Sequence, residues 1–304
     1  MSADTRVVFA GVTFNNPVVA ASGTFGFGRE YSEYYDLSEL GGICTKGLTL
    51  APRLGNPPPR IAETPMGMLN SVGLQNPGVE EFIRYELPFM RRFDTRVIAN
   101  IAGESAAEYA AMAERLSDAG VDMIEVNVSC PNVKNGGLQF GVSAAAVAEV
   151  TREVRRRANV PVMVKLSPNV TDITEMARAA ESEGADAVSL INTLLGMRID
   201  IKTRRPVLAN NTGGLSGAAV LPVALRMIWQ TRQAVRIPIL GMGGITTGAD
   251  AVEALLAGAS LVGVGTASFS YPEAALSIRD GIAEYMNQNK IGSVSELTGS
   301  VILN

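Results

Sequence analysis

The segment EVNVSCPNVKNGG, residues 125–137, places a cysteine where a strand-like run gives way to a loop. Cys130 is one of only two cysteines, and the chain contains no histidine. Nucleophile pairs of the Ser/His or Cys/His kind and histidine metal sites are therefore excluded. Acid and base chemistry must fall to Cys, Lys, Asp, Glu or Tyr. Cys130 is accordingly either a buried thiol at a strand end or a catalytic base.

Polar residues and glycines recur at the ends of the other strand-like runs. In chain order they are Ser22, Lys46, Asn100, Asn127 with Cys130, Lys165, Asn192 with Thr193, Gly243 with Gly244, and Gly265 with Thr266. Each alone has a simple structural explanation, as a turn former, a loop cap or a strand-end charge that reaches solvent. Together they indicate a ligand site, because runs this apolar gain nothing from a buried Lys or Asn without a partner.

Two glycine-rich strand ends, GMGG at 241–244 and GVG at 263–265, each precede a helical pattern. Glycine can serve only the turn, but it also lets backbone N–H groups approach an anion at a helix start. Two such loops favour a phosphorylated ligand. Flavin mononucleotide (FMN) would use this phosphate site, the amides, and Lys46 or Lys165 beside its ring. The rival use of a strand-end lysine is a Schiff base with a carbonyl substrate.

These residues can form one site only in a fold that places the ends of the strands close together. Short β-branched runs alternate with amphipathic segments along the chain, and the runs lie at 17–22, 42–47, 96–103, 123–130, 160–168, 186–193, 237–244 and 261–267. Strand and helix alternating in this way predict a (β/α)8 barrel of the α/β class, the TIM barrel, whose strand ends meet at one mouth. An open doubly wound sheet is the alternative, but GTFGFGRE after the first run lacks the spacing of its glycine fingerprint.

Several features are expected around the barrel. Strand patterns on both sides of Gly11 predict a small N-terminal β-hairpin that closes the lower end. Three long connections, 48–78, 131–142 and 194–217, are predicted to be active-site loops on the C-terminal face, because structureless loops beyond about 12 to 15 residues are usually functional. Barrels commonly reach this length as one unit, so we expect a single domain over 1–304.

Composition narrows the partners and the compartment. Hydrophobic residues make up 47% of the chain, charged residues 18%, and the net charge is −4, which gives no general attraction to nucleic acid or anionic lipid. Neither the start nor the glycine-interrupted stretch 254–272 has the pattern of a secretory signal or membrane span. We therefore expect a cytoplasmic protein without a membrane segment. Cys44, inside the second run, is expected to be a packed core thiol.

The sequence resembles the class 1 dihydroorotate dehydrogenases over nearly its whole length. The matching segments are KGLT (46–49), NSVGLQNPG (70–78), ANIAG (99–103), NVSCPNV (127–133), VKLSPN (164–169), NTLLGMRID (192–200), GGLSG (213–217), GMGGI (241–245) and GVGTA (263–267). NVSCPNVKNGG and NTLLGMRID are most similar to the class 1B, NAD-linked catalytic subunit. The homodimeric, fumarate-reducing class 1A enzyme is the nearest alternative, followed by a Schiff-base lyase using Lys165 and a non-catalytic phosphate-binding barrel.

The resemblance implies an FMN-dependent barrel that oxidises (S)-dihydroorotate to orotate in de novo pyrimidine biosynthesis, without a metal ion. The implied FMN-binding residues are Ser22, Lys46, Gly47, Asn100, Asn127, Lys165, Ile191, Gly217, Gly243, Gly244, Gly265 and Thr266. The implied substrate-binding residues are Lys46, Asn70, Ser71, Val72, Gly73, Leu74, Asn127, Asn132, Asn192 and Thr193. Asn211 and Ala218 depart from the family pattern on either side of GGLSG, which weakens the transfer to Gly217.

The same resemblance makes Cys130 the base that removes the substrate C5 proton while the C6 hydride passes to flavin N5. A thiol of ordinary pKa, about 8.5, is only a few per cent ionised at pH 7, so it needs a closing loop and a water-excluded pocket. The chain lacks cluster ligands and a convincing dinucleotide fingerprint. Electrons would therefore reach NAD through an iron-sulfur flavoprotein subunit with FAD and [2Fe-2S], in a heterotetramer built on a homodimer of this chain.

Overall fold

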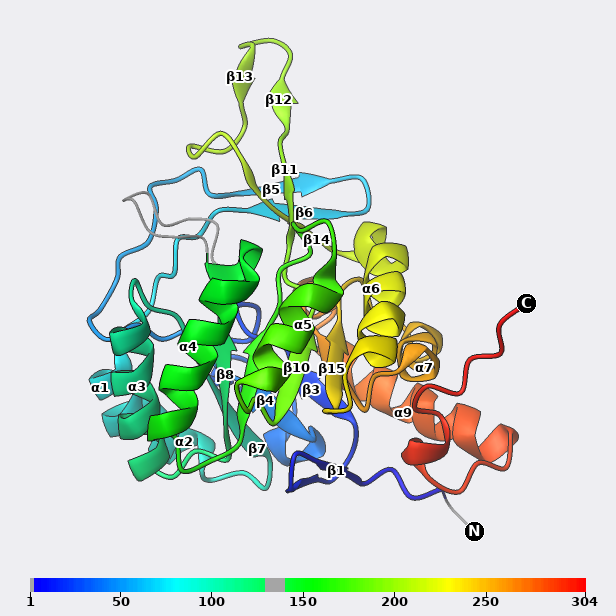
Figure 1. The fold of residues 1–304 in the computed structure, drawn as a ribbon. Coiled ribbons are helices and arrows are strands. Elements are labelled where there is room, and N and C mark those ends of the chain that lie inside the picture. The colour runs from blue at the N-terminus through cyan, green and yellow to red at the C-terminus, as the bar shows by residue number, and fades with distance from the viewer. Residues whose placement is uncertain (1–2, 129–139) are drawn as a thin grey trace.

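Eight parallel strands close into a barrel in the computed structural model of the chain, which describes residues 3–128 and 140–304 (Figure 1). In chain order these strands are β3 (Val18–Ala20), β4 (Gly42–Cys44), β7 (Arg96–Ile101), β8 (Met123–Asn127), β9 (Val162–Lys165), β10 (Ala187–Leu190), β15 (Ile239–Met242) and β16 (Leu261–Val264). Neighbours in this order pair in parallel, and β16 pairs with β3 to close the ring. Each predicted run contains one of these strands. The predicted barrel is confirmed, and the doubly wound alternative is wrong.

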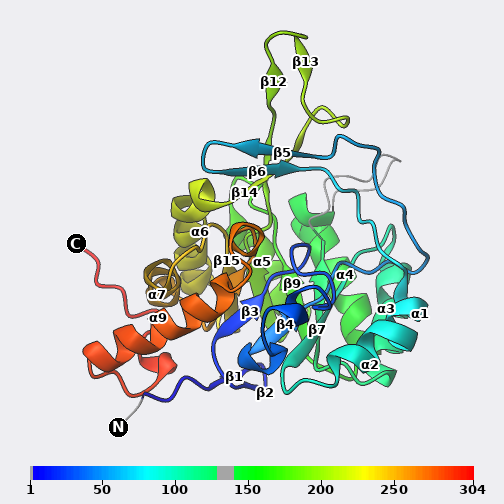
Figure 2. The same cartoon turned by 180° about the vertical axis from the view of Figure 1, so that it is seen from behind.

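Helices surround the barrel on its outer side (Figures 1 and 2). They are α1 (Val79–Glu81), the π-helix η3 (Phe82–Glu86), α2 (Leu87–Met90), α3 (Ala106–Asp118), α4 (Ala144–Arg157), α5 (Ile173–Ser182), α6 (Leu221–Ala234), α7 (Gly248–Ala257), α8 (Ala267–Ser270) and α9 (Ala274–Gln288). Short 3-10 helices are η1 (Tyr31–Glu33), η2 (Leu37–Glu39), η4 (Phe140–Val142), η5 (Ala218–Val220) and η6 (Val294–Glu296). The β3–β4 connection contains only η1 and η2, so the expected alternation lacks an α-helix there. No helix of the described ranges is long and apolar enough to span a bilayer.

The period of two in the strands divides the core into two layers. On β8, Met123 packs inside the barrel, whereas Ile124 belongs to the layer between barrel and helices. Helix α5 contributes Met176 and Ala177 to the outer layer. Each fully buried aliphatic side chain stabilises the fold by about 1.5 to 3 kcal/mol. These layers hold the strand ends in fixed positions.

The lower end of the barrel is closed by an N-terminal hairpin, as predicted. Strands β1 (Val7–Phe9) and β2 (Val12–Phe14) pair antiparallel below the barrel (Figure 2). The Phe9 and Phe14 rings are fully buried in the inner core, edge to face, with centroids 6.1 Å apart. Ala10 and Gly11 have positive φ values of 48° and 81°, as a tight hairpin turn requires. The two rings therefore plug the bottom of the barrel.

The upper, C-terminal end carries a sheet that the sequence did not predict. Strands β5 (Ile61–Thr64), β6 (Gly67–Asn70), β11 (Leu194–Gly196) and β14 (Gly213–Ser216) form an antiparallel sheet in the order β11-β14-β6-β5 (Figures 1 and 2). We call it the lid sheet. The expectation of structureless loops is wrong for 48–78 and 194–217, which supply these strands. The third loop, 131–142, lies largely outside the described residues.

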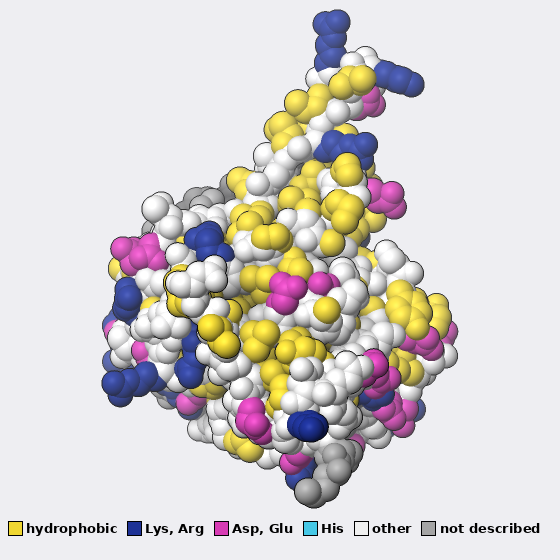
Figure 3. Space-filling model, turned by 90° about the vertical axis from the view of Figure 1, so that its right-hand side faces the viewer, with side chains coloured by type: hydrophobic (Ala, Val, Ile, Leu, Met, Phe, Trp, Pro, Cys, Tyr) yellow, Lys and Arg dark blue, Asp and Glu magenta, His cyan; other side chains and the backbone are white. Residues whose placement is uncertain are grey.

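An arm, residues 194–206, rises from the lid sheet and ends in the hairpin of β12 (Ile199–Asp200) and β13 (Arg205–Pro206) (Figure 1). Every second side chain along its first half is apolar and more than half exposed, namely those of Leu195, Met197, Ile199 and Ile201. Figure 3 shows hydrophobic side chains following the arm, with basic residues near its tip. The arm therefore presents an apolar strip to solvent.

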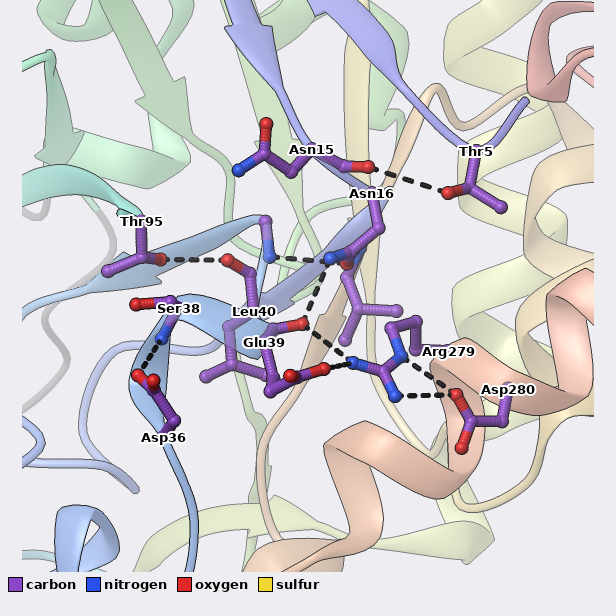
Figure 4. A network of polar contacts seen from close by, with 12 residues as sticks. Thr5, Asn15, Asn16, Asp36, Ser38, Glu39, Leu40, Thr95, Arg279 and Asp280 are labelled. Atoms are coloured by element: carbon purple, nitrogen blue, oxygen red, sulfur yellow. Dashed lines mark hydrogen bonds and ion pairs between the residues drawn. The ribbon is translucent and has the colours of Figure 1, made fainter. Parts of the chain in front are cut away.

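A polar network fixes the lower connections (Figure 4). Asn16 Oδ1 accepts from the N–H groups of Val18 (3.1 Å) and Gly41 (3.2 Å), and its Nδ2 donates to the Glu39 carbonyl (3.0 Å). Arg279 of α9 donates to the same carbonyl at 3.2 Å and also to the Glu39 carboxylate. Asn16 is buried, so the two bonds to Glu39 and Gly41 join the chain before β3 to the chain before β4 without competition from water.

Replacement of Asn16 by alanine is expected to lower the free energy of unfolding by about 2 to 3 kcal/mol, because the buried Val18 N–H loses its partner and the two bonds to Gly41 and Glu39 are lost. The adjacent Asn15 is the matched control: it is exposed, and its Nδ2 lies 3.2 Å from Asp94 Oδ2. Asn15→Ala should cost about 0.5 kcal/mol. Urea unfolding followed by circular dichroism measures both values, and equal losses would contradict the role given to Asn16.

Candidate active site

The predicted polar strand ends meet at the upper mouth of the barrel. Asn127 and Lys165 are the last residues of β8 and β9 and are register partners, while Asn100 lies beside them on β7. Lys46 follows β4 by two residues, and its N–H donates to the Gly26 carbonyl at 2.9 Å. Ile191 follows β10 directly, and its N–H donates to the Met242 carbonyl at 2.8 Å. Five strand ends thus supply neighbouring groups, as predicted.

One side of the mouth is built from amides. Asn192 Nδ2 donates to Asn127 Oδ1 at 3.2 Å, and Asn192 Oδ1 accepts from the Thr193 N–H at 2.8 Å. The lid sheet reaches the same region, because Thr193 directly precedes β11 and Asn70 Nδ2 donates to the Gly214 carbonyl at 3.4 Å. Ser71 is fully buried, and its Oγ has no hydrogen-bond partner in the described part of the chain. These amides and this hydroxyl are able to bind a small polar molecule.

Some of the predicted site residues lie beside the mouth, and two lie outside the described residues. Val72, Gly73 and Leu74 continue from β6 beside the mouth, and Leu74 has a positive φ of 58°. Cys130 and Asn132 lie outside the described residues, so the predicted base and one predicted substrate contact have no position here. A cavity of about 1070 Å³ opens beside the mouth and includes Lys46 and Val72 among its lining residues. Its remaining walls come mainly from 23–34, 52–54 and 268–272, away from the amide side.

The predicted glycines form a cradle at the opposite side. Gly217, Gly243 and Gly244 have φ values of 104°, 122° and 80°, which disfavour any side chain. A Cβ at Gly217 would lie 2.4 Å from the Gly67 Cα, and one at Gly244 would lie 2.6 Å from the Leu221 nitrogen. These turns therefore need glycine for close backbone approach.

The loop after β16 completes this cradle. Gly265 and Thr266 precede the short helix α8, and Thr266 Oγ1 donates to Ser216 Oγ of β14 at 2.8 Å. Ser22 follows β3, the strand that pairs with β16. Loops after the seventh and eighth strands, together with a short extra helix, commonly bind phosphate in barrels of this type. The geometry therefore suits the phosphorylated ligand that the glycine pattern predicts.

A buried carboxylate that was not predicted lies directly below the mouth. Glu125 of β8 has no exposed surface, and its Oε1 accepts from Ser189 Oγ at 2.6 Å. Its Oε2 accepts from Cys44 Sγ at 2.9 Å and from Asn100 Nδ2 at 2.5 Å. Lys165 Nζ lies 3.7 Å from the same oxygen. Groups from β4, β7, β9 and β10 thus surround one carboxylate.

Electrostatics keep this carboxylate ionised. Burial raises the pKa of Glu125, but the Lys165 ammonium and the three hydrogen bonds outweigh burial, so the net pKa lies below the usual value. Burial, followed by the negative charge of Glu125, raises the pKa of the Cys44 thiol well above its usual value. Cys44 is therefore a protonated donor. The prediction that it is a core thiol is confirmed, with the addition of a hydrogen bond.

A sequence signal for Glu125 was present. The run MIEVN places a carboxylate between apolar residues, two positions before Asn127 and hence on the same, inward face. An acidic residue in a buried strand needs donors, which were available in Asn100 and Lys165 on the neighbouring strands. The local pattern could thus have identified the residue.

Comparison with known proteins agrees with this geometry. A family model described as dihydroorotate dehydrogenase matches residues 5–286. Relatives named "Dihydroorotate dehydrogenase B (NAD(+)), catalytic subunit" include one from Alkaliphilus oremlandii, 57% identical over 97% of this chain and 98% of its own length. Others are from Lachnoclostridium phytofermentans, at 55% identity over 98% and 99% of the two chains, and Geotalea daltonii, at 54% over 98% of each.

Proposed function

The chain belongs to the dihydroorotate dehydrogenase family, and from this premise we propose that it is the catalytic subunit of an NAD-linked, class 1B enzyme. It oxidises (S)-dihydroorotate to orotate in pyrimidine biosynthesis. The observation that carries the proposal is the meeting of Lys165, Asn100 and Asn127 at a mouth whose far side is a glycine cradle. The fumarate-reducing class 1A alternative is not favoured, because the relatives above bear the class B name.

The groups at the mouth fit FMN. Asn100 Oδ1 is buried without a hydrogen-bond partner among the described residues, so it can accept from a ring N–H. Lys165 and Lys46 would lie near the ring edge that becomes anionic on reduction, and Gly217, Gly244 and their neighbours would bind the phosphate. When bound, FMN supplies a hydride acceptor. The same positive charges suit a ligand that carries a carboxylate.

The chain's own residues would orient the substrate, remove its proton and exclude water. Asn127, Asn192 and Thr193 would orient dihydroorotate through its amide and carboxylate groups, since the Asn192 side chain is hydrogen-bonded both to Asn127 and to the backbone N–H of Thr193. Cys130 would remove the C5 proton while the C6 hydride leaves. The lid sheet would limit access of water to this region. A base held in this way typically contributes about 10² to 10⁴ in rate.

Transfer of electrons from the reduced flavin to NAD requires a partner subunit. We propose an iron-sulfur flavoprotein subunit carrying FAD and [2Fe-2S], bound to this chain in a heterotetramer whose centre is a homodimer of the chain. The relatives' designation as catalytic subunits supports a partner, as does the presence of only two cysteines, too few for a cluster. The apolar strip on the arm supports an interface, because such exposed patches mark protein contacts. A cytoplasmic location is part of the same proposal.

Replacement of Cys130 by alanine should leave the purified chain yellow but slow flavin reduction by dihydroorotate at least 100-fold, because the C5 proton has no acceptor. Anaerobic stopped-flow absorbance measures the rate. Cys44→Ser, which keeps a hydroxyl donor for Glu125, is the control for losing a thiol and should reduce at a rate within a few-fold of wild type. Near-normal reduction in Cys130→Ala refutes the base. A colourless wild-type protein trapped by borohydride through Lys165 would instead indicate a Schiff-base lyase.

Gly244→Ala should weaken FMN binding at least tenfold, because its Cβ would displace backbone at the cradle. Gly120 is a matched control: its φ is 81° against 80° for Gly244, yet a Cβ there meets nothing within 4 Å. Both variants should lose about 1 to 2 kcal/mol of stability from the unfavourable φ. Fluorescence titration of apoprotein with FMN separates them, and equal FMN affinity in the two variants would remove Gly244 from the cradle.

The chain purified alone should reduce NAD slowly or not at all with dihydroorotate, while addition of the partner subunit should restore rapid NADH formation. Absorbance at the NADH band measures this directly, and fumarate serves as the competing acceptor. Rapid NAD reduction by the chain alone would contradict the partner. Fumarate reduction faster than any partner-supported NAD reduction would favour class 1A.

A further inference from the structure

We infer that Glu125 is a positioning residue for the cofactor: its buried carboxylate holds the Lys165 ammonium at the mouth and fixes which end of the Asn100 amide faces the ligand. The inference rests on the proposed FMN site. It concerns a residue that lies below the site and acts through its neighbours.

The position of Glu125 excludes direct contact with substrate. On β8 it occupies the inward position below Asn127, and it is fully buried, whereas Asn127 at the mouth is partly exposed. A buried ionised carboxylate is costly unless donors surround it. Here Ser189, Cys44 and Asn100 donate to it, and Lys165 balances its charge. The carboxylate is thus the one partner that the three donors and the Lys165 ammonium share.

The Asn100 amide has one orientation in this arrangement. An ionised carboxylate can only accept hydrogen bonds, so Asn100 must direct its NH₂ group toward Glu125, with Nδ2 2.5 Å from Oε2. Oδ1 is therefore turned away from Glu125 and has no hydrogen-bond partner among the described residues. Gly47 gives this oxygen room, since a Cβ there would lie 2.9 Å from it. Glu125 consequently determines that the site presents an acceptor at Asn100.

Lys165 depends on the same carboxylate for its place. Its side chain is only 7% exposed, and Nζ lies 3.7 Å from Glu125 Oε2. A buried ammonium is costly unless a nearby negative charge balances it. A reduced flavin gains negative charge, which a fixed ammonium stabilises more than it stabilises the neutral oxidised ring. Loss of the Glu125 charge also removes a repulsion, but the carboxylate lies below the mouth and the ammonium at it, so displacement of Lys165 is the larger effect. Binding of reduced FMN should therefore weaken more than binding of oxidised FMN.

The test is the reduction potential of FMN bound to the purified full chain, measured anaerobically against a reference dye. Glu125→Gln keeps the side-chain volume but removes the charge and adds an NH₂ group facing existing donors. The ratio of reduced to oxidised FMN affinity should fall about tenfold, which corresponds to a potential lower by about 30 mV for a two-electron couple. Ser189→Ala removes one hydrogen bond to the same carboxylate and no charge, so the ratio should change less than threefold.

Glu125→Asp provides a second variant if the glutamine protein does not fold: the shortened carboxylate should lower the potential in the same direction, by less. An unchanged or raised potential in the folded variants would overturn the inference, as would an equal fall in Ser189→Ala. These results leave the proposed function intact if wild-type flavin is still reduced by dihydroorotate. A wild-type protein that binds no flavin would instead defeat the proposed function itself.

Discussion

A charge buried inside an apolar barrel must be surrounded by groups that satisfy it, and this constraint arranges the upper interior of the molecule. Glu125 is inaccessible to water, so the neighbouring strands have to direct donors toward it. They do so with side chains of different chemistry: a thiol, a hydroxyl, an amide and an ammonium. Two of these, Asn100 and Lys165, also face the mouth. The interior and the mouth are therefore one electrostatic system.

The two ends of the barrel differ in the side chains that fill them. Below, Phe9 and Phe14 fill the interior with aromatic rings, and the Asn16 network fixes the connections around them. Above, small and polar residues replace bulky ones at the strand ends, and the lid sheet supplies cover. The inward side chains of the strands are thus apolar in the lower half of the barrel and polar in its upper half.

Prediction from sequence succeeded where the signal is local. The runs of β-branched residues gave all eight barrel strands, and polar residues at their ends gave the mouth, because parallel strands of a barrel end on one face. The lid sheet was missed because β14 pairs with β6, about 145 residues earlier, and non-local pairing leaves no periodic pattern in either loop. Glu125 was missed for a different reason. It was treated as part of a strand rather than as a charge that needs partners.

The plugged lower end has a consequence for turnover. In the described part of the chain Phe9 and Phe14 occupy the base, so we expect orotate to leave through the upper mouth, by the route along which dihydroorotate arrives. A puckered acid and a planar acid of nearly equal size then compete for the same mouth. Accumulated product should accordingly slow the reaction by simple competition, which makes removal of orotate by the following reaction a condition for steady flux.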